Sequence, residues 1–158
     1  MSRTERVVHC PPEHVFAVLA DGWTYATWVV GAARIRAVDD GWPAVGASIH
    51  HSVGGWPLLL SDTTQVEQVE QADTGARLQL KVRAWPTGAG RVRLTLTPIP
   101  DAGGTGGVGT RVTMEEDAVA GPARMVPRLV RDPMLHARNV EALRRLALLA
   151  EGRGGAAE

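Results

Sequence analysis

Apolar and polar residues alternate along the middle of this chain of 158 residues. From about residue 32 to residue 98 the apolar side chains recur at every second position, which is the period of a β-strand. The segment 76–85 shows this well, with Leu78, Leu80, Val82 and Ala84 on one face and Arg77, Gln79, Lys81 and Arg83 on the other. The pattern predicts an antiparallel sheet with one face in water and the other covered.

Helical patterns lie on either side of this region. Pro12 suits the first turn of a short helix, and Asp21-Gly22 ends it. Asp132-Pro133 opens a later segment in which one helical face carries Leu135, Asn139, Leu143 and Leu146. The predicted order is a strand at 4–10, short helices at 12–20 and 23–29, strands at 33–38, 47–53, 57–71, 76–85, 91–97 and 109–119, and a long helix at 133–150.

This order predicts an α+β fold, in which a curved antiparallel sheet of about seven strands wraps around the long C-terminal helix and two short helices follow the first strand. A sheet of this length must curl, and the C-terminal helix is the element that can fill its concave face. Because a curled sheet and a helix do not pack tightly along their whole length, we expect a cavity between them. Residues 1–150 should form a single ligand-binding domain, followed by a disordered tail at 151–158.

Charge and cysteine content exclude several classes of function. Lys and Arg total 17 and Asp and Glu total 17, so no strong field favours nucleic acid. Cys10 is the single cysteine, which excludes an internal disulfide and a thiolate metal cluster. The N-terminal segment has no apolar signal core, and no segment reaches the roughly 18 apolar residues of a membrane helix. We therefore expect a cytoplasmic monomer or homodimer without membrane insertion.

Two motifs suggest a cofactor or a metal at first sight. The segment 104–109 matches G-x-G-x-x-G, but a dinucleotide site needs a parallel strand before it and a helix after it. The residues after Gly109 alternate as a strand, so we interpret the motif as a hairpin loop and expect no cofactor. His50 and His51 are adjacent on a strand and point to opposite faces, so they cannot share a metal ion.

The segments Pro11–Phe16, Trp28–Gly31 and His136–Leu146, together with the consecutive strands between them, resemble the START/Bet v1-like helix-grip superfamily (SRPBCC). Within it, the match is to bacterial polyketide cyclase/dehydrase-like proteins, over about residues 4–150. The resemblance implies a cavity for a small hydrophobic or aromatic molecule, polyketide-like or lipid-like. Because this group includes aromatase/cyclases as well as lipid and hormone carriers, the resemblance leaves catalysis open.

Three titratable side chains are candidate catalytic residues. The parity that turns Ile49 and Val53 inward also turns His51 inward, where an imidazole can act as an acid or a base near neutral pH. Asp62 and Glu116 have inward parity on their own strands, and either carboxylate could pair with His51. The alternative for His51 is a structural hydrogen bond to a neighbouring strand. For each acid the alternative is a bulge that turns it outward.

Six residues are candidate ligand contacts: Trp28, Trp56, Thr64, Met114, Leu135 and Asn139. Trp28 and Trp56 are placed where such folds open and suit a rim around an aromatic ligand. The alternative for each, ordinary core and turn packing, carries the greater weight. Asn139 interrupts the apolar stripe of the last helix. Its amide can bind a ligand oxygen or tie the helix to the sheet.

Two hypotheses on function follow. In a cyclase/dehydrase-like enzyme, the cavity folds a poly-carbonyl chain so that an enolisable carbon lies near a carbonyl. His51, helped by Asp62 or Glu116, then moves the proton, and Asn139 binds a carbonyl oxygen. A non-catalytic carrier or sensor needs only the apolar cavity and the tryptophan rim.

Overall fold

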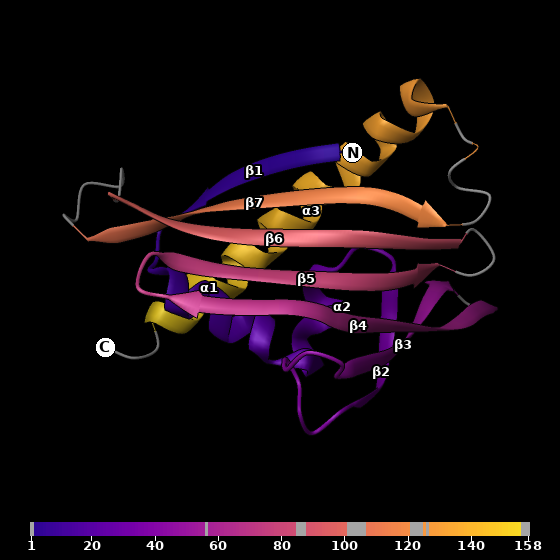
Figure 1. Cartoon of the computed structure of the whole chain (residues 1–158), viewed down its shortest axis with the longest axis horizontal. Coiled ribbons are helices and arrows are strands. Elements are labelled where there is room, and N and C mark those ends of the chain that lie inside the picture. The colour runs from indigo at the N-terminus through magenta and orange to yellow at the C-terminus, as the bar shows by residue number, and fades with distance from the viewer. Residues whose placement is uncertain are drawn as a thin grey trace.

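The structure is a computed structural model that describes residues 2–55, 57–84, 88–100, 107–120, 125 and 127–155. The α+β fold predicted from the sequence is confirmed (Figure 1). The elements are β1 (Ser2–Val8), α1 (Pro12–Ala20), a 3₁₀ turn η1 (Gly22–Thr24), α2 (Tyr25–Trp28), β2 (Ala32–Val38), β3 (Ser48–Gly55), β4 (Leu58–Ala72), β5 (Gly75–Ala84), β6 (Gly88–Pro100), β7 (Val108–Ala120) and α3 (Arg128–Gly155).

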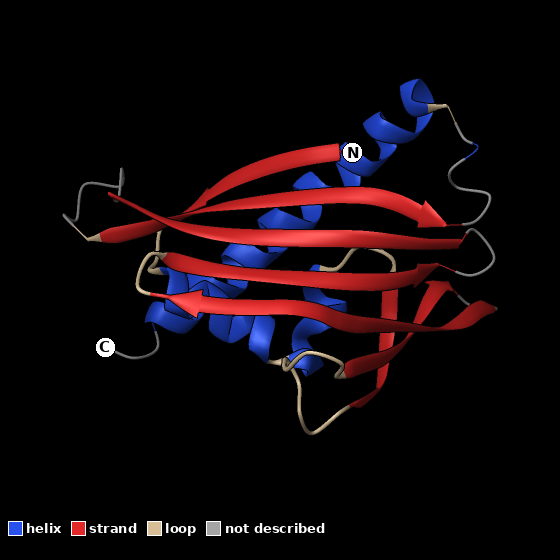
Figure 2. Ribbon diagram, in the orientation of Figure 1, coloured by secondary structure: helices blue, strands red, loops and turns tan. Residues whose placement is uncertain are grey.

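The strands form one antiparallel sheet in the order β1-β7-β6-β5-β4-β3-β2. Six strands follow each other as hairpins, and β1 closes the series by pairing with β7, with Thr4 opposite Met114. Figure 2 shows α3 crossing one face of this sheet, with the shorter helices on the same side. This topology leaves β1 and β2 as the two edges and places all the helices on one face.

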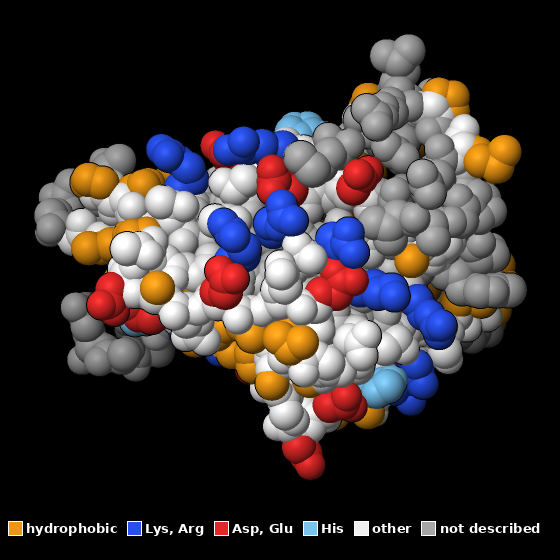
Figure 3. Space-filling model, in the orientation of Figure 1, with side chains coloured by type: hydrophobic (Ala, Val, Ile, Leu, Met, Phe, Trp, Pro, Cys, Tyr) orange, Lys and Arg blue, Asp and Glu red, His pale blue; other side chains and the backbone are white. Residues whose placement is uncertain are grey.

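The two faces of the sheet differ as the alternation predicts. Charged side chains of both signs are interspersed over the outer face (Figure 3). On this face Arg91 forms a salt bridge with Glu67, and Gln79 donates to the same carboxylate. Each such exposed pair contributes about 0–1 kcal/mol, so the outer face favours solubility more than stability.

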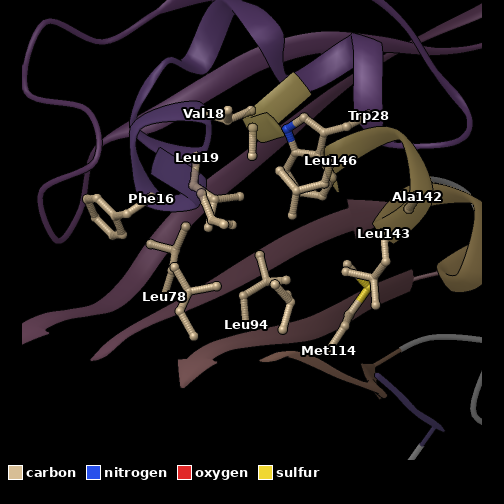
Figure 4. Close-up of a cluster of buried hydrophobic side chains, with 14 of the residues drawn as sticks. Phe16, Val18, Leu19, Trp28, Leu78, Leu94, Met114, Ala142, Leu143 and Leu146 are labelled. Carbon is tan, nitrogen blue, oxygen red and sulfur yellow. The ribbon is translucent and has the colours of Figure 1, made fainter. Parts of the chain in front are cut away.

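The inner face supplies the core of the molecule, together with one face of α3 (Figure 4). The buried strand residues include Leu78, Leu80, Leu94, Leu96, Val112 and Met114. The buried residues of α3 recur every three or four positions: Asn139, Ala142, Leu143, Leu146, Ala147 and Ala150. Among the other elements, α3 packs mainly against β1 and α1. None of the helices in the described ranges is long and apolar enough to span a membrane.

The bounds of the long helix differ from the prediction. α3 begins at Arg128, so Pro133 lies inside the helix rather than at its start. At the other end α3 continues to Gly155, so the first five residues of the predicted tail are helical. The backbone N–H of His9 donates to Glu151, and Arg153 forms a salt bridge with Asp21. These two contacts hold a last turn whose glycines disfavour a helix.

The G-x-G-x-x-G segment is followed by a strand. β7 begins at Val108, inside the motif, and no helix starts there. Residues 104–106 lie outside the described ranges. A strand in this position cannot present a helix N-terminus to a pyrophosphate, so the interpretation as part of a hairpin connection agrees with β7.

Candidate functional site

A cavity of about 290 Å³ lies between the sheet and the helices, close to the β3–β4 turn. Its walls come from α2 and the residues after it, from β3, β4 and β5, and from α3. The apolar part of its lining includes Val29, Val30, Ala32, Val53 and Val82. The polar part is Tyr25, His51, Asp62, Arg83 and Arg138. Polar groups from five elements therefore converge on a space with otherwise apolar walls.

A smaller space of about 60 Å³ adjoins this cavity and shares Tyr25, Val29, Val30, Val82 and Arg138 with it. It extends toward the core, where Trp28, Met114 and Asn139 line it. A larger groove of about 680 Å³ lies at the opposite end of the sheet, beside α1 and the β4–β5 turn. The acidic side chains of that groove, Glu13 and Asp73, are exposed to solvent, whereas His51 and Asp62 are buried, so we place the candidate site in the cavity of about 290 Å³.

A hydrogen-bonded chain of three side chains crosses the interior beside the cavity. Thr64 Oγ1 lies 2.9 Å from the hydroxyl of Tyr25 and 3.1 Å from Nε2 of His51. The rings of Tyr25 and His51 are 5.2 Å apart between centroids. A threonine hydroxyl donates a single proton, so at least one of its two neighbours must donate to it. The hydrogen bond between Nε2 of His51 and Thr64 therefore holds the imidazole ring against β4.

His51 is a neutral imidazole at physiological pH. Its side chain is 1% exposed, and this burial, together with the cation of Arg36 and the neighbouring His50, lowers its pKa to about 4. Nδ1 of His51 is buried and has no hydrogen-bond partner among the described residues. A buried imidazole nitrogen left without a partner costs about 1–3 kcal/mol. The hydrogen bond from His51 to a neighbouring strand, predicted from the sequence as its alternative role, is thus present through Nε2 and Thr64. It leaves Nδ1 without a hydrogen-bond partner among the described residues.

Asp62 lies directly opposite His51 in the pairing of β3 with β4. Directly opposite residues on one face of a sheet have Cβ atoms roughly 4.5–5.5 Å apart. One carboxylate oxygen accepts from the backbone N–H of Thr63 at 2.7 Å, while Oδ2 is buried with no partner in the described part of the chain. Burial raises the pKa of Asp62, and the N–H of Thr63 and the Arg83 cation act in the opposite direction.

Glu116 does not join this pair. Its carboxylate forms a salt bridge with Arg138 of α3 and accepts from Nδ2 of Asn139 at 3.1 Å. Both partners come from one turn of α3, so Glu116 ties that helix to β7. Glu116 also lines the small space and not the larger cavity. Of the two acids predicted to pair with His51, the pairing of the strands brings Asp62 next to it.

A family model described as "Polyketide cyclase / dehydrase and lipid transport" matches residues 2–151. The chain belongs to this family. The match covers the whole sheet, α1, α2 and most of α3, and therefore every described residue that lines the two interior spaces. A comparison with curated proteins finds no significant match.

Solved structures with the same fold agree with the family assignment. A STAR-related lipid transfer protein from Xanthomonas axonopodis superposes with a TM-score of 0.69 at 16% identity, covering 94% of this chain and 84% of that chain. Ara h 8.0201 superposes with a TM-score of 0.65 at 12% identity, covering 95% of this chain and 96% of that chain. A protein of unknown function from Staphylococcus aureus superposes with a TM-score of 0.65 at 11% identity, covering 97% of this chain and 94% of that chain. These likenesses confirm the predicted helix-grip fold and, at such low identity, nothing beyond the fold.

The other residues predicted to contact a ligand do not gather in one place in the structure. Trp28 is 4% exposed, packs edge-on against Tyr25 and lines the smaller space, so it is a wall residue rather than a rim residue. Met114 lines the same space, and Leu135 on α3 is half-buried. Trp56 lies outside the described residues.

Thr64 and Asn139 are both buried and hydrogen-bonded within the protein. Thr64 is fully buried and holds the ring of His51 and the hydroxyl of Tyr25, so it positions the polar wall. For Asn139, the bond to Glu116 supports the alternative in which the amide ties the helix to the sheet. Neither side chain is among the residues that line the cavity of about 290 Å³.

Tyr25 and Arg83 line the candidate site and were not predicted from the sequence. Tyr25 is the single tyrosine of the chain, in an otherwise apolar segment next to Trp28, and that isolation was the available signal. Burial raises the pKa of Tyr25 to about 12, so its hydroxyl stays protonated and can donate. The alternation along β5 predicts that Arg83 points away from the covered face. It nevertheless lines the cavity, because it lies near the end of β5 at the mouth of the cavity. In the described ranges no three metal-binding side chains gather.

Proposed function

We propose that the protein binds a compact, mostly apolar molecule in the interior cavity, with one polar group of that molecule placed against His51 and Asp62. The observation that carries this proposal concerns two buried atoms, Nδ1 of His51 and Oδ2 of Asp62. Neither has a hydrogen-bond partner among the described residues, and both residues line the same cavity. Buried polar atoms in folded proteins are nearly always hydrogen-bonded, so an unpaired pair beside a cavity supports a ligand that completes it.

The dimensions and the lining narrow the class of ligand. Small-molecule pockets span about 300–1,000 Å³, and the cavity of about 290 Å³ lies at the lower end of that range. This volume suits a molecule with one or two rings, or a short acyl chain, better than a long-chain lipid. The valines around the cavity favour an apolar body, while His51 and Asp62 favour a hydroxyl or an enol at its inner end.

Calorimetric titration with 2-naphthol and with octanoate tests the proposal. We expect saturable binding of 2-naphthol to the native protein. Val82→Phe places a larger side chain in the cavity and should weaken this binding at least about tenfold. Val45→Phe makes the same chemical change at a side chain that is 63% exposed, and it should leave the affinity unchanged. The proposal fails if neither probe binds more tightly than about 1 mM, or if the two variants bind alike.

A second candidate function is acid–base catalysis on a carbonyl compound in the same cavity. The neutral imidazole of His51 and the carboxyl group of Asp62 each have one atom with no hydrogen-bond partner in the described part of the chain, which supports proton transfer to or from a ligand. In a cyclisation, the base takes a proton from the carbon between two carbonyl groups. That carbon then forms a bond to the carbon of another carbonyl group further along the same chain, and the oxygen of that group takes up a proton. The step therefore needs no oxidant or reductant.

Incubation with a linear poly-β-ketone distinguishes an enzyme from a carrier. For an enzyme we expect the native protein to change the ratio of cyclised products relative to buffer, and His51→Gln to return it to the buffer ratio. The same variant should still bind 2-naphthol, because Gln can keep the contact to Thr64. A product ratio that the native protein leaves unchanged, while 2-naphthol binds, would favour the carrier.

A further inference from the structure

The start of β4 exposes three consecutive leucines at the tip of the β3–β4 hairpin. Leu58 is 77% exposed, Leu59 45% and Leu60 36%. Neighbouring residues of a strand point to opposite faces, so both faces of this tip are apolar and open to solvent. The facing strand covers little of them, because Leu58 pairs with Gly55 and Leu59 with Gly54. We refer to Leu58–Leu60 as the leucine tip.

Basic side chains lie at the same end of the sheet. Arg34 on β2 pairs with Ser52, one position along β3 from the residue that pairs with Leu60. Arg83 lies near the end of β5, the strand next to β4 (Figure 1). Neither Arg34 nor Arg83 forms a salt bridge with a carboxylate in the ranges that the structure describes, unlike Arg91 and Arg93 in the middle of the outer face. Arg34 and Arg83 therefore flank the leucine tip with positive charge, although the Arg83 cation also acts on the carboxyl group of Asp62.

The leucine tip also lies beside the cavity. Val53 and Gly54, which pair with Leu60 and Leu59, line the cavity, and so does Arg83. A surface that covers the leucines would therefore meet the protein at the rim of the binding site.

We propose that the leucine tip docks this end of the protein on an anionic phospholipid membrane, with the leucines in the boundary between headgroups and acyl chains and Arg34 and Arg83 against lipid phosphates. Exposed leucines beside arginines that form no salt bridge among the described residues match an anionic lipid surface, because the leucines add apolar burial and the arginines add charge attraction. The docking is peripheral and reversible, since three leucines bury little area. It places the cavity rim at the bilayer, where an apolar ligand can exchange without crossing water.

Flotation with phospholipid vesicles tests this docking. We expect the native protein to float with phosphatidylcholine vesicles that contain about 30% phosphatidylglycerol, and to be released by added salt. Leu58→Ser combined with Leu59→Ser should reduce the bound fraction at least about tenfold, because it removes most of the apolar contact. Leu148→Ser, at a leucine of α3 that is 59% exposed, is the matched control and should bind as the native protein does.

A second pair of variants tests the charge. Arg34→Gln should weaken vesicle binding about fivefold, whereas Arg77→Gln, at the opposite end of the sheet on β5, should have no effect. The proposal is overturned if the native protein does not float, or if the double leucine variant floats equally. It is also overturned if light scattering shows that the leucines join two copies of the chain. The double variant should still bind 2-naphthol in solution, so failure of docking and failure of ligand binding are separable.

Discussion

Replacement of Leu146 by alanine is expected to lower the free energy of unfolding by about 2–5 kcal/mol. Leu146 is fully buried on the face of α3 that meets the core (Figure 4). The substitution removes apolar burial and leaves a void that the packed strands can fill only in part. Urea denaturation followed by circular dichroism at 222 nm measures the change, and the slope of the transition reports whether unfolding stays two-state.

Leu148→Ala is the matched control for this prediction. Leu148 lies two residues further along α3 and is 59% exposed, so the same substitution removes little buried area. The change in helix propensity is identical at both positions and cancels in the comparison. We expect Leu148→Ala to shift stability by no more than about 0.5 kcal/mol. Equal losses in the two variants would contradict the packing of α3 against the sheet.

The strands were predictable because their alternation is clean and their turns carry glycine. The turn around Gly54-Gly55 joins two strands so closely that 55 pairs with 58, and the same register then puts His51 opposite Asp62. Sequence parity had already turned both side chains inward. Strand geometry therefore determines this half of the candidate site, because every second residue of a regular hairpin shares a face.

The part of the site that α3 provides could not be predicted in the same way. Which residues Glu116 meets depends on the rotation and the height of α3 above the sheet, and no local pattern encodes either quantity. In the structure Arg138 and Asn139 reach Glu116, which takes that carboxylate out of the cavity. Tyr25 was missed for a related reason. Its role depends on Thr64, which lies 39 residues away on β4.

The ends of α3 show how tertiary contacts override local preference. Pro133 suggested a helix start because proline lacks a backbone N–H, yet the helix begins at Arg128. The absence of a helical period after residue 150 suggested an end there, yet the helix continues to Gly155. The salt bridge from Arg153 to Asp21 and the bond from the N–H of His9 to Glu151 become possible only after the chain has folded.

Acidification from pH 6.5 to pH 4 is expected to cost the protein up to about 3 kcal/mol of stability through His51 alone. A histidine in the unfolded chain has a pKa near 6.5, whereas burial lowers the pKa of His51 to about 4 in the folded protein. Between these values the unfolded chain binds a proton that the folded protein excludes. The contribution of His51 is therefore present above pH 6.5 and is lost as the pH falls through 4. Urea denaturation at a series of pH values measures it.

Two variants isolate this contribution from the other titrating groups. His51→Gln cannot take up the proton and should lose less stability on acidification. His50→Gln, half-exposed on the opposite face, removes only the smallest cause of the lowered pKa of His51 and should retain most of the loss. A loss in His51→Gln equal to that of the native protein would contradict a buried, neutral imidazole.

Asp62 acts on the same pH profile with the opposite sign. Burial raises the pKa of its carboxyl group, so Asp62 contributes stability at low pH that is lost as the pH rises through that raised value. In the native protein this partly offsets the loss from His51, and Asp62→Asn should therefore make the acid loss steeper. The two groups act on opposite ends of the pH range because burial favours the uncharged form of each side chain. A ligand hydroxyl or enol between Nδ1 and Oδ2 would be bonded most strongly where His51 is neutral and Asp62 is ionised, and its affinity should fall as Asp62 takes up a proton.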